Sequence, residues 1–145
     1  MTVLAELERK GLITRISTNS RRVKDLLRLA ARDLRVARTL NRESPDWAYS
    51  IAYNRMLQSA RVLMFSRGYR STGTTSHFAV IAFLRSAYSQ QLGTLIGELD
   101  RMRKKRHVSV YDTAGTISES EAEYALKVSS RFHERAKNLL SSKGP

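Results

Sequence analysis

The sequence predicts an all-α protein, an antiparallel bundle of four to five helices with up-and-down connections. Two observations favour this class. Apolar residues recur every three or four positions along several stretches of roughly twenty residues, which is the spacing of one helix face. The only prolines are Pro45 and Pro145, so long helices can form without interruption. The 145 residues fit one domain, residues 1–145, around a single hydrophobic core.

The N-terminal part predicts a short helix followed by a long one. Within residues 1–15 the short helix covers 3–10, and Gly11 is suited to end it in a left-handed conformation. Polar residues at 17–20 can cap the next helix. The three- and four-residue spacing of its apolar stripe predicts one buried face. That stripe consists of Val23, Leu26, Leu27, Ala30, Leu34 and Ala37.

A second start signal is Ser44-Pro45-Asp46, where a serine caps the helix and a proline takes its first position. Arg67-Gly68 ends this helix, and residues 69–75, rich in Gly, Ser and Thr, predict an exposed loop. Trp47, Tyr49 and Tyr53 are expected in the core or in a dimer interface rather than stacked on bases. The residues expected to face inward are Trp47, Ile51, Met56, Ala60 and Leu63.

The next stretch predicts a helix that begins near Ser76. A further helix follows, either separately or after a kink near Ser89, and runs into a basic segment. Gly93 and Gly97, four residues apart, indicate either close contact with another helix or a locally weakened helix.

The last helix has the clearest start signal in the chain. After a loop at 112–117, Ser118 and Glu121 have the spacing of a capping box. Residues 141–145 are expected to fray.

Two other histidines receive structural interpretations. His77 is expected to pack or cap at a helix start, and His133 is expected on the surface of the last helix.

The charge balance narrows the class of partner. Lys and Arg number 26 against 13 Asp and Glu, a formal net charge of +13. Such an excess repels itself in a compact state unless a polyanion is usually bound, and nucleic acid is the first candidate. No apolar run reaches the roughly 20 residues of a membrane span, so no membrane partner is expected.

Other features address location and cofactors. The chain has no cysteine and its first residues lack a signal-peptide core, which favours a cytoplasmic location. No cofactor or metal site is expected, since no phosphate-binding loop, dinucleotide-binding motif or zinc-protease motif occurs.

The first long helix has a strongly basic face. Arginine suits bidentate contact with phosphate, whereas a solvated helix face normally mixes charges of both signs. A solvated face is the alternative interpretation. One set of arginines projects from nearly the same side, at a spacing of seven: Arg21, Arg28, Arg35 and Arg42. The nucleic-acid-binding candidates are Arg28, Arg32 and Arg35.

The segment 99–112, LDRMRKKRHVSVYD, is the most informative stretch of the chain. It combines cations, a histidine and a tyrosine, as required to hold an RNA phosphate and to move a proton beside it. His107 and Tyr111 share a face if the helix persists, but β-branched residues at 108 and 110 favour a break. Basic residues here could alternatively complement the helix dipole. The nucleic-acid-binding candidates are Arg103, Lys104 and Lys105.

These residues resemble those of the HEPN family of small helical bundles, several of which are metal-independent endoribonucleases. The resemblance covers most of the chain, through DWAYSIAYNRMLQSARVLMFSRGYR, SHFAVIAFL and RMRKKRHVSVYD. The family motif is an arginine, usually a polar residue next, and a histidine four to six residues after the arginine.

Two registers fit that motif. In the preferred register Arg106 is the arginine, His107 the polar residue, and Tyr111 replaces the histidine, as in a branch where RHxxxYD is common. In the other register Arg101 and His107 have the required spacing, but a methionine occupies the polar position.

The resemblance implies a homodimer whose two motifs face one cleft. Arg106 would steady the scissile phosphate, His107 would activate the ribose 2′-hydroxyl, and Tyr111 would position phosphate or water. It also implies an MNT-type nucleotidyltransferase partner, often as toxin and antitoxin, for which Tyr111 could be the modified residue. The alternatives are a non-catalytic HEPN subunit that binds nucleotide or nucleic acid and docks the nucleotidyltransferase, and a generic polyanion-binding bundle.

Overall fold

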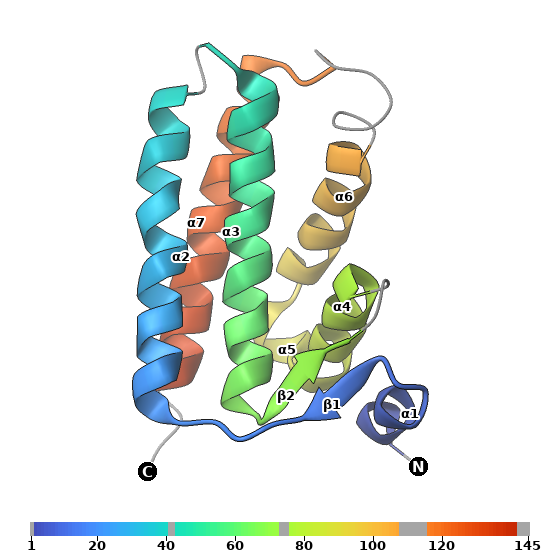
Figure 1. Ribbon diagram of the computed structural model, residues 1–145. Coiled ribbons are helices and arrows are strands. Elements are labelled where there is room, and N and C mark those ends of the chain that lie inside the picture. Colours follow the sequence, from blue (N-terminus) through green and yellow to red (C-terminus); the bar gives the residue numbers. More distant parts are fainter. Residues whose placement is uncertain (1, 41–42, 73–75, 108–115, 142–145) are drawn as a thin grey trace.

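The computed structural model describes residues 2–40, 43–72, 76–107 and 116–141, which form a helical bundle with a small sheet at one end (Figure 1). The helices are α1 (Val3–Arg9), α2 (Ser20–Leu40), α3 (Pro45–Ser66), α4 (Ser76–Ala87), α5 (Ser89–Leu92), α6 (Leu95–His107) and α7 (Glu119–Ser141). The strands are β1 (Ile13–Arg15) and β2 (Tyr69–Ser71). The predicted all-α class is confirmed.

Helix α3 is the centre of the bundle. It packs against α2 on one side and α6 on the other, with α7 behind it (Figure 1). The side chains of Tyr53, Met56 and Leu63 are fully buried, and Phe132 of α7 meets this core. Because apolar residues occur all around α3, this helix is enclosed by the others, whereas α2 and α7 each bury a single stripe.

The predicted start signals are confirmed as hydrogen-bonded caps. The Ser44 side chain accepts a hydrogen bond from the backbone N–H of Trp47 at the start of α3. At α7, the backbone N–H of Glu121 donates to Ser118 Oγ over 3.0 Å, and the N–H of Ser118 donates to Glu121 Oε1 over 3.1 Å. These bonds satisfy N–H groups that a helix start leaves without partners.

Trp47 is an exception to the predicted core, since 67% of its surface is exposed. Met56 comes nine positions after it, which is two and a half helical turns, so the two side chains project from opposite sides of α3. Ile51, between them, is half-buried. The inward assignment of Trp47 was therefore wrong.

The predicted exposed loop at 69–75 begins with a strand. Tyr69–Ser71 pairs antiparallel with Ile13–Arg15, with Ile13 opposite Ser71 and Arg15 opposite Tyr69. Gly68 (φ +84°) makes the turn out of α3, and a Cβ there would lie 3.3 Å from the carbonyl oxygen of Ile16. Residues 73–75 lie outside the described ranges.

The region between α4 and α6 breaks twice. A short α5 follows the kink predicted near Ser89, and Gly93 (φ +55°) then ends it. A Cβ at Gly97 would meet nothing within 4 Å, so Gly97 does not provide a close helix contact. In the described part of the chain, no helix is both long enough and apolar enough to cross a membrane.

Candidate functional site

The basic segment forms the last turns of α6, and acidic side chains engage most of its cations. Arg103 donates two hydrogen bonds to Asp100 Oδ1, at 3.1 and 3.0 Å, and Lys104 Nζ lies 3.6 Å from the other oxygen of Asp100. Lys105 Nζ lies 2.9 Å from Glu121 on α7. These ion pairs fix the end of α6 in the bundle.

Asp100 organises this end of α6. Its partial burial raises its pKa, but the hydrogen bond from Arg103 and the charges of Arg103, Lys104 and Arg85 outweigh that effect. The pKa of Asp100 therefore lies below its usual value. A single carboxylate thus serves three basic side chains, which leaves the surroundings strongly positive.

Arg101, the arginine of the second motif register, points into solvent. Its side chain is 66% exposed and lies 2.7 Å from Glu98 one turn earlier. An exposed ion pair of this kind contributes little to stability and already occupies the guanidinium.

Arg106, the arginine of the preferred register, has different surroundings. Its guanidinium carbon lies 5.5 Å from the centroid of the Tyr53 ring, within the range of a cation–π contact. Its Nε is buried and has no hydrogen-bond partner among the described residues. Buried donors are normally satisfied, so an unpaired N–H marks a place where a ligand could bind.

The two remaining motif residues lie at the edge of the described structure. His107 is the last residue of α6 and is exposed. Tyr111 falls within 108–115, outside the described residues, so the predicted shared face of His107 and Tyr111 remains a prediction.

His77, interpreted from sequence as a helix-start residue, joins this site from α4. Its Nδ1 lies 2.9 Å from Tyr53 Oη, and the two rings are tilted with centroids 5.8 Å apart. Partial burial lowers the pKa of His77, and the charges of Arg61, Arg106 and Arg103 lower it further. Burial raises the pKa of Tyr53 to about 12, so this hydroxyl keeps its proton at neutral pH.

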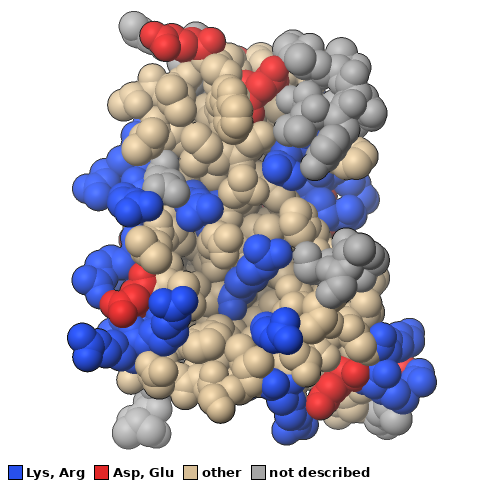
Figure 2. Space-filling model, in the orientation of Figure 1, with Lys and Arg blue, Asp and Glu red and all other residues tan. Residues whose placement is uncertain are grey.

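The α2 arginines lie away from this site. Arg28 forms an ion pair with Asp25 and lines a cavity between α2 and α7. Helix α3 stands between α2 and α6 (Figure 1), so the two predicted basic clusters do not face each other directly. Figure 2 shows basic side chains over both regions and along the middle of the same face, with few acidic ones among them.

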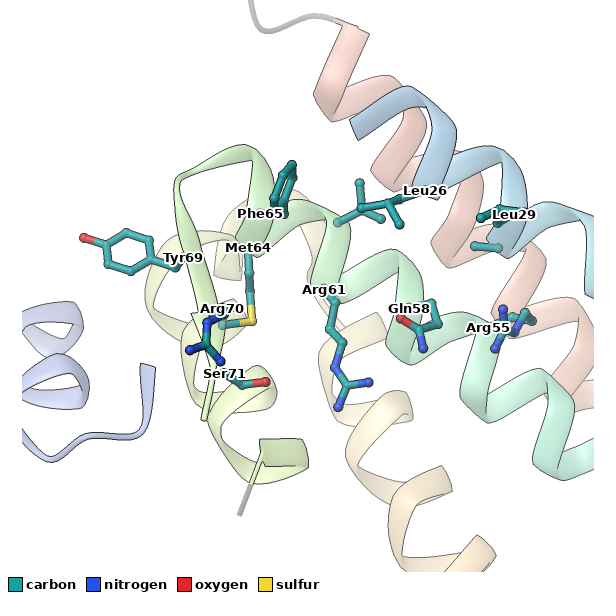
Figure 3. A pocket seen from close by; sticks show the side chains of 12 residues that line it. Leu26, Leu29, Arg55, Gln58, Arg61, Met64, Phe65, Tyr69, Arg70 and Ser71 are labelled. Carbon is teal, nitrogen blue, oxygen red and sulfur yellow. The ribbon is translucent and has the colours of Figure 1, made fainter. Parts of the chain in front are cut away.

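A cavity of about 610 Å³ lies on the other side of α2, along α3 and next to β2. Figure 3 shows Arg55 and Arg61 along α3 and Arg70 from β2 at its edge, with Leu26, Leu29 and Phe65 among its apolar lining. These three arginines were not sequence candidates. Their charges are spread over two elements, so no run of basic residues marks them.

The surface position predicted for His133 was wrong. The residue is 9% exposed, and its Nδ1 lies 3.2 Å from Ser59 Oγ on α3. Charged residues follow it in the sequence at Glu134 and Arg135, but α7 turns the His133 side chain toward α3. Within the described ranges, no three His, Asp or Glu side chains are grouped so that they could hold a metal ion.

The fold and the site together define a class: a small helical bundle with a cluster of cationic side chains where α3, α4 and α6 meet. A family model described as the HEPN domain matches residues 23–139. That range covers most of the chain, and the protein belongs to the HEPN family. No curated protein matches its sequence significantly.

Proposed function

We propose that this HEPN protein acts on RNA as a metal-independent endoribonuclease. One observation carries the proposal: Arg106, the arginine of the preferred register, is held at the end of α6 against Tyr53, and its buried Nε has no hydrogen-bond partner among the described residues. A guanidinium in this position can bind a phosphate oxygen and stabilise the charge that develops on it during the reaction. The net charge of +13 also supports a polyanionic substrate.

The chemistry follows from the roles that the family resemblance gives these residues. The ribose 2′-oxygen attacks the neighbouring phosphorus while its proton passes to the His107 imidazole, which acts as the general base in this scheme. The bond from phosphorus to the 5′-oxygen breaks, and that oxygen takes up a proton. The products are a 2′,3′-cyclic phosphate and a 5′-hydroxyl end. Tyr111 positions phosphate or water in this scheme.

The surroundings of the two candidate arginines favour the preferred motif register. Arg101 is exposed and paired with Glu98, whereas Arg106 is partly buried against an aromatic ring. Desolvated cations act on a phosphate more strongly than exposed ones, since water screens them less. We therefore assign the phosphate to Arg106 and not to Arg101.

The biological setting forms part of the proposal. We propose a cytoplasmic homodimer that brings two motifs to one cleft, and a toxin role beside an MNT-type nucleotidyltransferase as antitoxin. The exposed position of His107 at the end of α6 supports a site completed by a second copy.

The experiment is an RNA cleavage assay with the full chain, with and without a chelator, comparing the wild type with Arg106→Ala, His107→Ala and Tyr111→Phe. We expect cleavage to survive chelation and Arg106→Ala to lose about 100-fold or more in rate, the cost of removing one transition-state donor. Arg101→Ala is the matched control and should lose less than Arg106→Ala. Far-UV circular dichroism checks that each variant folds.

Two results contradict the proposal. If the pure wild-type protein leaves RNA intact both with and without metal, the proposed catalytic role is contradicted. Tight co-purification with a nucleotidyltransferase would then favour the non-catalytic docking subunit. If Arg101→Ala and Arg106→Ala lose the same fraction of the cleavage rate, the assignment of Arg106 as the motif arginine is contradicted.

A further inference from the structure

Tyr53 joins two side chains that are distant in sequence and that the family motif does not connect. His77 of α4 meets its hydroxyl over 2.9 Å, and Arg106 of α6 lies over its ring at 5.5 Å. Tyr53 itself is fully buried in α3 and belongs to the core. The core therefore holds the imidazole at the hydroxyl and the guanidinium over the ring of one buried aromatic residue.

The hydrogen bond to Tyr53 selects one form of the His77 ring. The Tyr53 hydroxyl is protonated and buried, and His77 is its only hydrogen-bond partner among the described residues. A buried hydroxyl proton needs an acceptor, so Tyr53 donates to Nδ1. The neutral imidazole then carries its proton on Nε2, which is left to donate to a ligand.

Positive charge dominates the surroundings of this pair. Arg61 from α3 and Arg103 and Arg106 from α6 all act on His77, and burial lowers the pKa of Arg61 as well as that of His77. Asp100 is close enough for its charge to act on Tyr53, but Arg103 and Lys104 already engage it. Partly buried cations in such excess are costly, and a bound anion would offset that cost.

We propose that His77, positioned by Tyr53, forms a phosphate-binding subsite with Arg106 and Arg61 that holds a backbone phosphate of the RNA. This inference rests on the proposed function for the identity of the ligand. His77 donates from Nε2, and the two guanidinium groups supply planar donor forks that match phosphate oxygens. The start of α4 adds the partial positive charge of a helix N-terminus.

Arg61 connects this subsite to the cavity along α3. It lines that cavity together with Arg55 and Arg70, and its charge also acts on His77 (Figure 3). In the proposed complex, successive phosphates of one RNA strand lie along these arginines, with Arg61 common to the cavity and the subsite. A strand with several phosphates fits this arrangement better than a single nucleotide does.

Phosphate binding at this subsite is linked to protonation. A bound anion opposes the charges that lower the pKa of His77, so His77 takes up a proton at Nδ1 on binding. The Tyr53 hydroxyl oxygen then accepts a hydrogen bond from Nδ1–H in place of donating one to Nδ1. Binding is then tighter at acidic pH and weakens as the pH rises through the pKa of the complex. If binding raises the pKa of His77 by one unit, the affinity at acidic pH is about tenfold higher than the affinity at a pH where His77 stays neutral.

The test uses the full chain and a 2′-O-methylated oligoribonucleotide, which binds but cannot be cleaved. Fluorescence anisotropy measures its affinity between pH 5.5 and 8 for the wild type, His77→Gln, Tyr53→Phe and Arg61→Gln. Arg131→Gln, an exposed arginine of α7, is the charge-matched control. The same titration with a mononucleotide separates a free nucleotide from an RNA backbone.

We expect His77→Gln to bind about tenfold more weakly at pH 5.5 and to lose the pH dependence, because Gln keeps a donor but does not titrate. Arg61→Gln should weaken binding more than Arg131→Gln. In the wild type, NMR should show that sulfate, whose charge is constant over this range, raises the pKa of the His77 ring. Tyr53→Phe should change the ring nitrogen signals of His77.

The inference is overturned if His77→Gln keeps the affinity and pH dependence of the wild type, or if sulfate leaves the His77 titration unchanged. Tighter binding of the mononucleotide overturns the RNA assignment. These results are independent of cleavage: binding through His77 without cleavage of ordinary RNA contradicts only the proposed enzyme. If the protein cleaves RNA but His77→Gln leaves binding unchanged, only the proposed subsite is contradicted.

Discussion

Ser59 Oγ and His133 Nδ1 lie 3.2 Å apart in the interface of α3 and α7, where both residues are buried. Burial lowers the pKa of His133, and the charge of Glu134 opposes the shift only in part. The folded protein therefore holds this imidazole neutral at pH values where the unfolded chain begins to protonate it.

The first prediction is that acid destabilises the fold through this histidine. Between the lowered folded pKa and the unfolded value of about 6.5, the unfolded chain binds more protons, so stability rises with pH. The contribution is complete above about pH 6.5 and is lost as the pH falls below it. Urea unfolding at pH 8 and pH 5 should show a smaller pH effect in His133→Gln than in the wild type. An equal effect in both proteins contradicts this origin.

The second prediction concerns the centre of α3. Leu63→Ala should lower the free energy of unfolding by about 2–5 kcal/mol, because it leaves a cavity beside fully buried neighbours. Leu29→Ala is chemically the same change at a side chain that is 45% exposed, and it should cost about 0.5 kcal/mol or less. Denaturant unfolding compares the two. Similar losses would show that α3 is not the main core helix.

The third prediction tests the capping box of α7. Ser118→Ala removes the acceptor of the Glu121 N–H and should cost about 1 kcal/mol, a fall of roughly 3–5 °C in Tm. Ser120→Ala, on the exposed first turn of the same helix, is the matched control. Calorimetry that finds the same Tm for both variants would contradict the role of the cap.

The fourth prediction compares the two basic surfaces. The cavity arginines Arg55, Arg61 and Arg70, changed together to Gln, should reduce the salt dependence of single-stranded RNA binding. A phosphate contact contributes about 0.7 to the slope of log K against log salt, so the loss is up to about 2.

The matched control for that comparison is the triple change of Arg28, Arg32 and Arg35 on α2. We expect a smaller change in slope, since Arg28 faces the cavity on the α7 side and is paired with Asp25. A larger change from the α2 variant would instead support the footprint expected from sequence alone.

Local sequence was sufficient for the helices and their ends. The serine caps at Ser44 and Ser118 and the turn at Gly68 act between residues a few positions apart, so their signals are complete within a short window. The stripe of α2 was equally clear because one side of that helix faces the core. The pattern was weaker in α3, which is enclosed on most sides, and Trp47 was misplaced there.

The sequence by itself determined an all-α bundle of the HEPN family, its excess of positive charge and the two candidate registers of the motif, at Arg106 and at Arg101. Only the tertiary structure decided which side chains meet. Tyr53 and His77 are 24 residues apart, and Ser59 and His133 are 74 apart. Each pair exists because two helices pack in one particular rotation and register, and the free energy that sets this packing is distributed over the whole core rather than encoded near either residue.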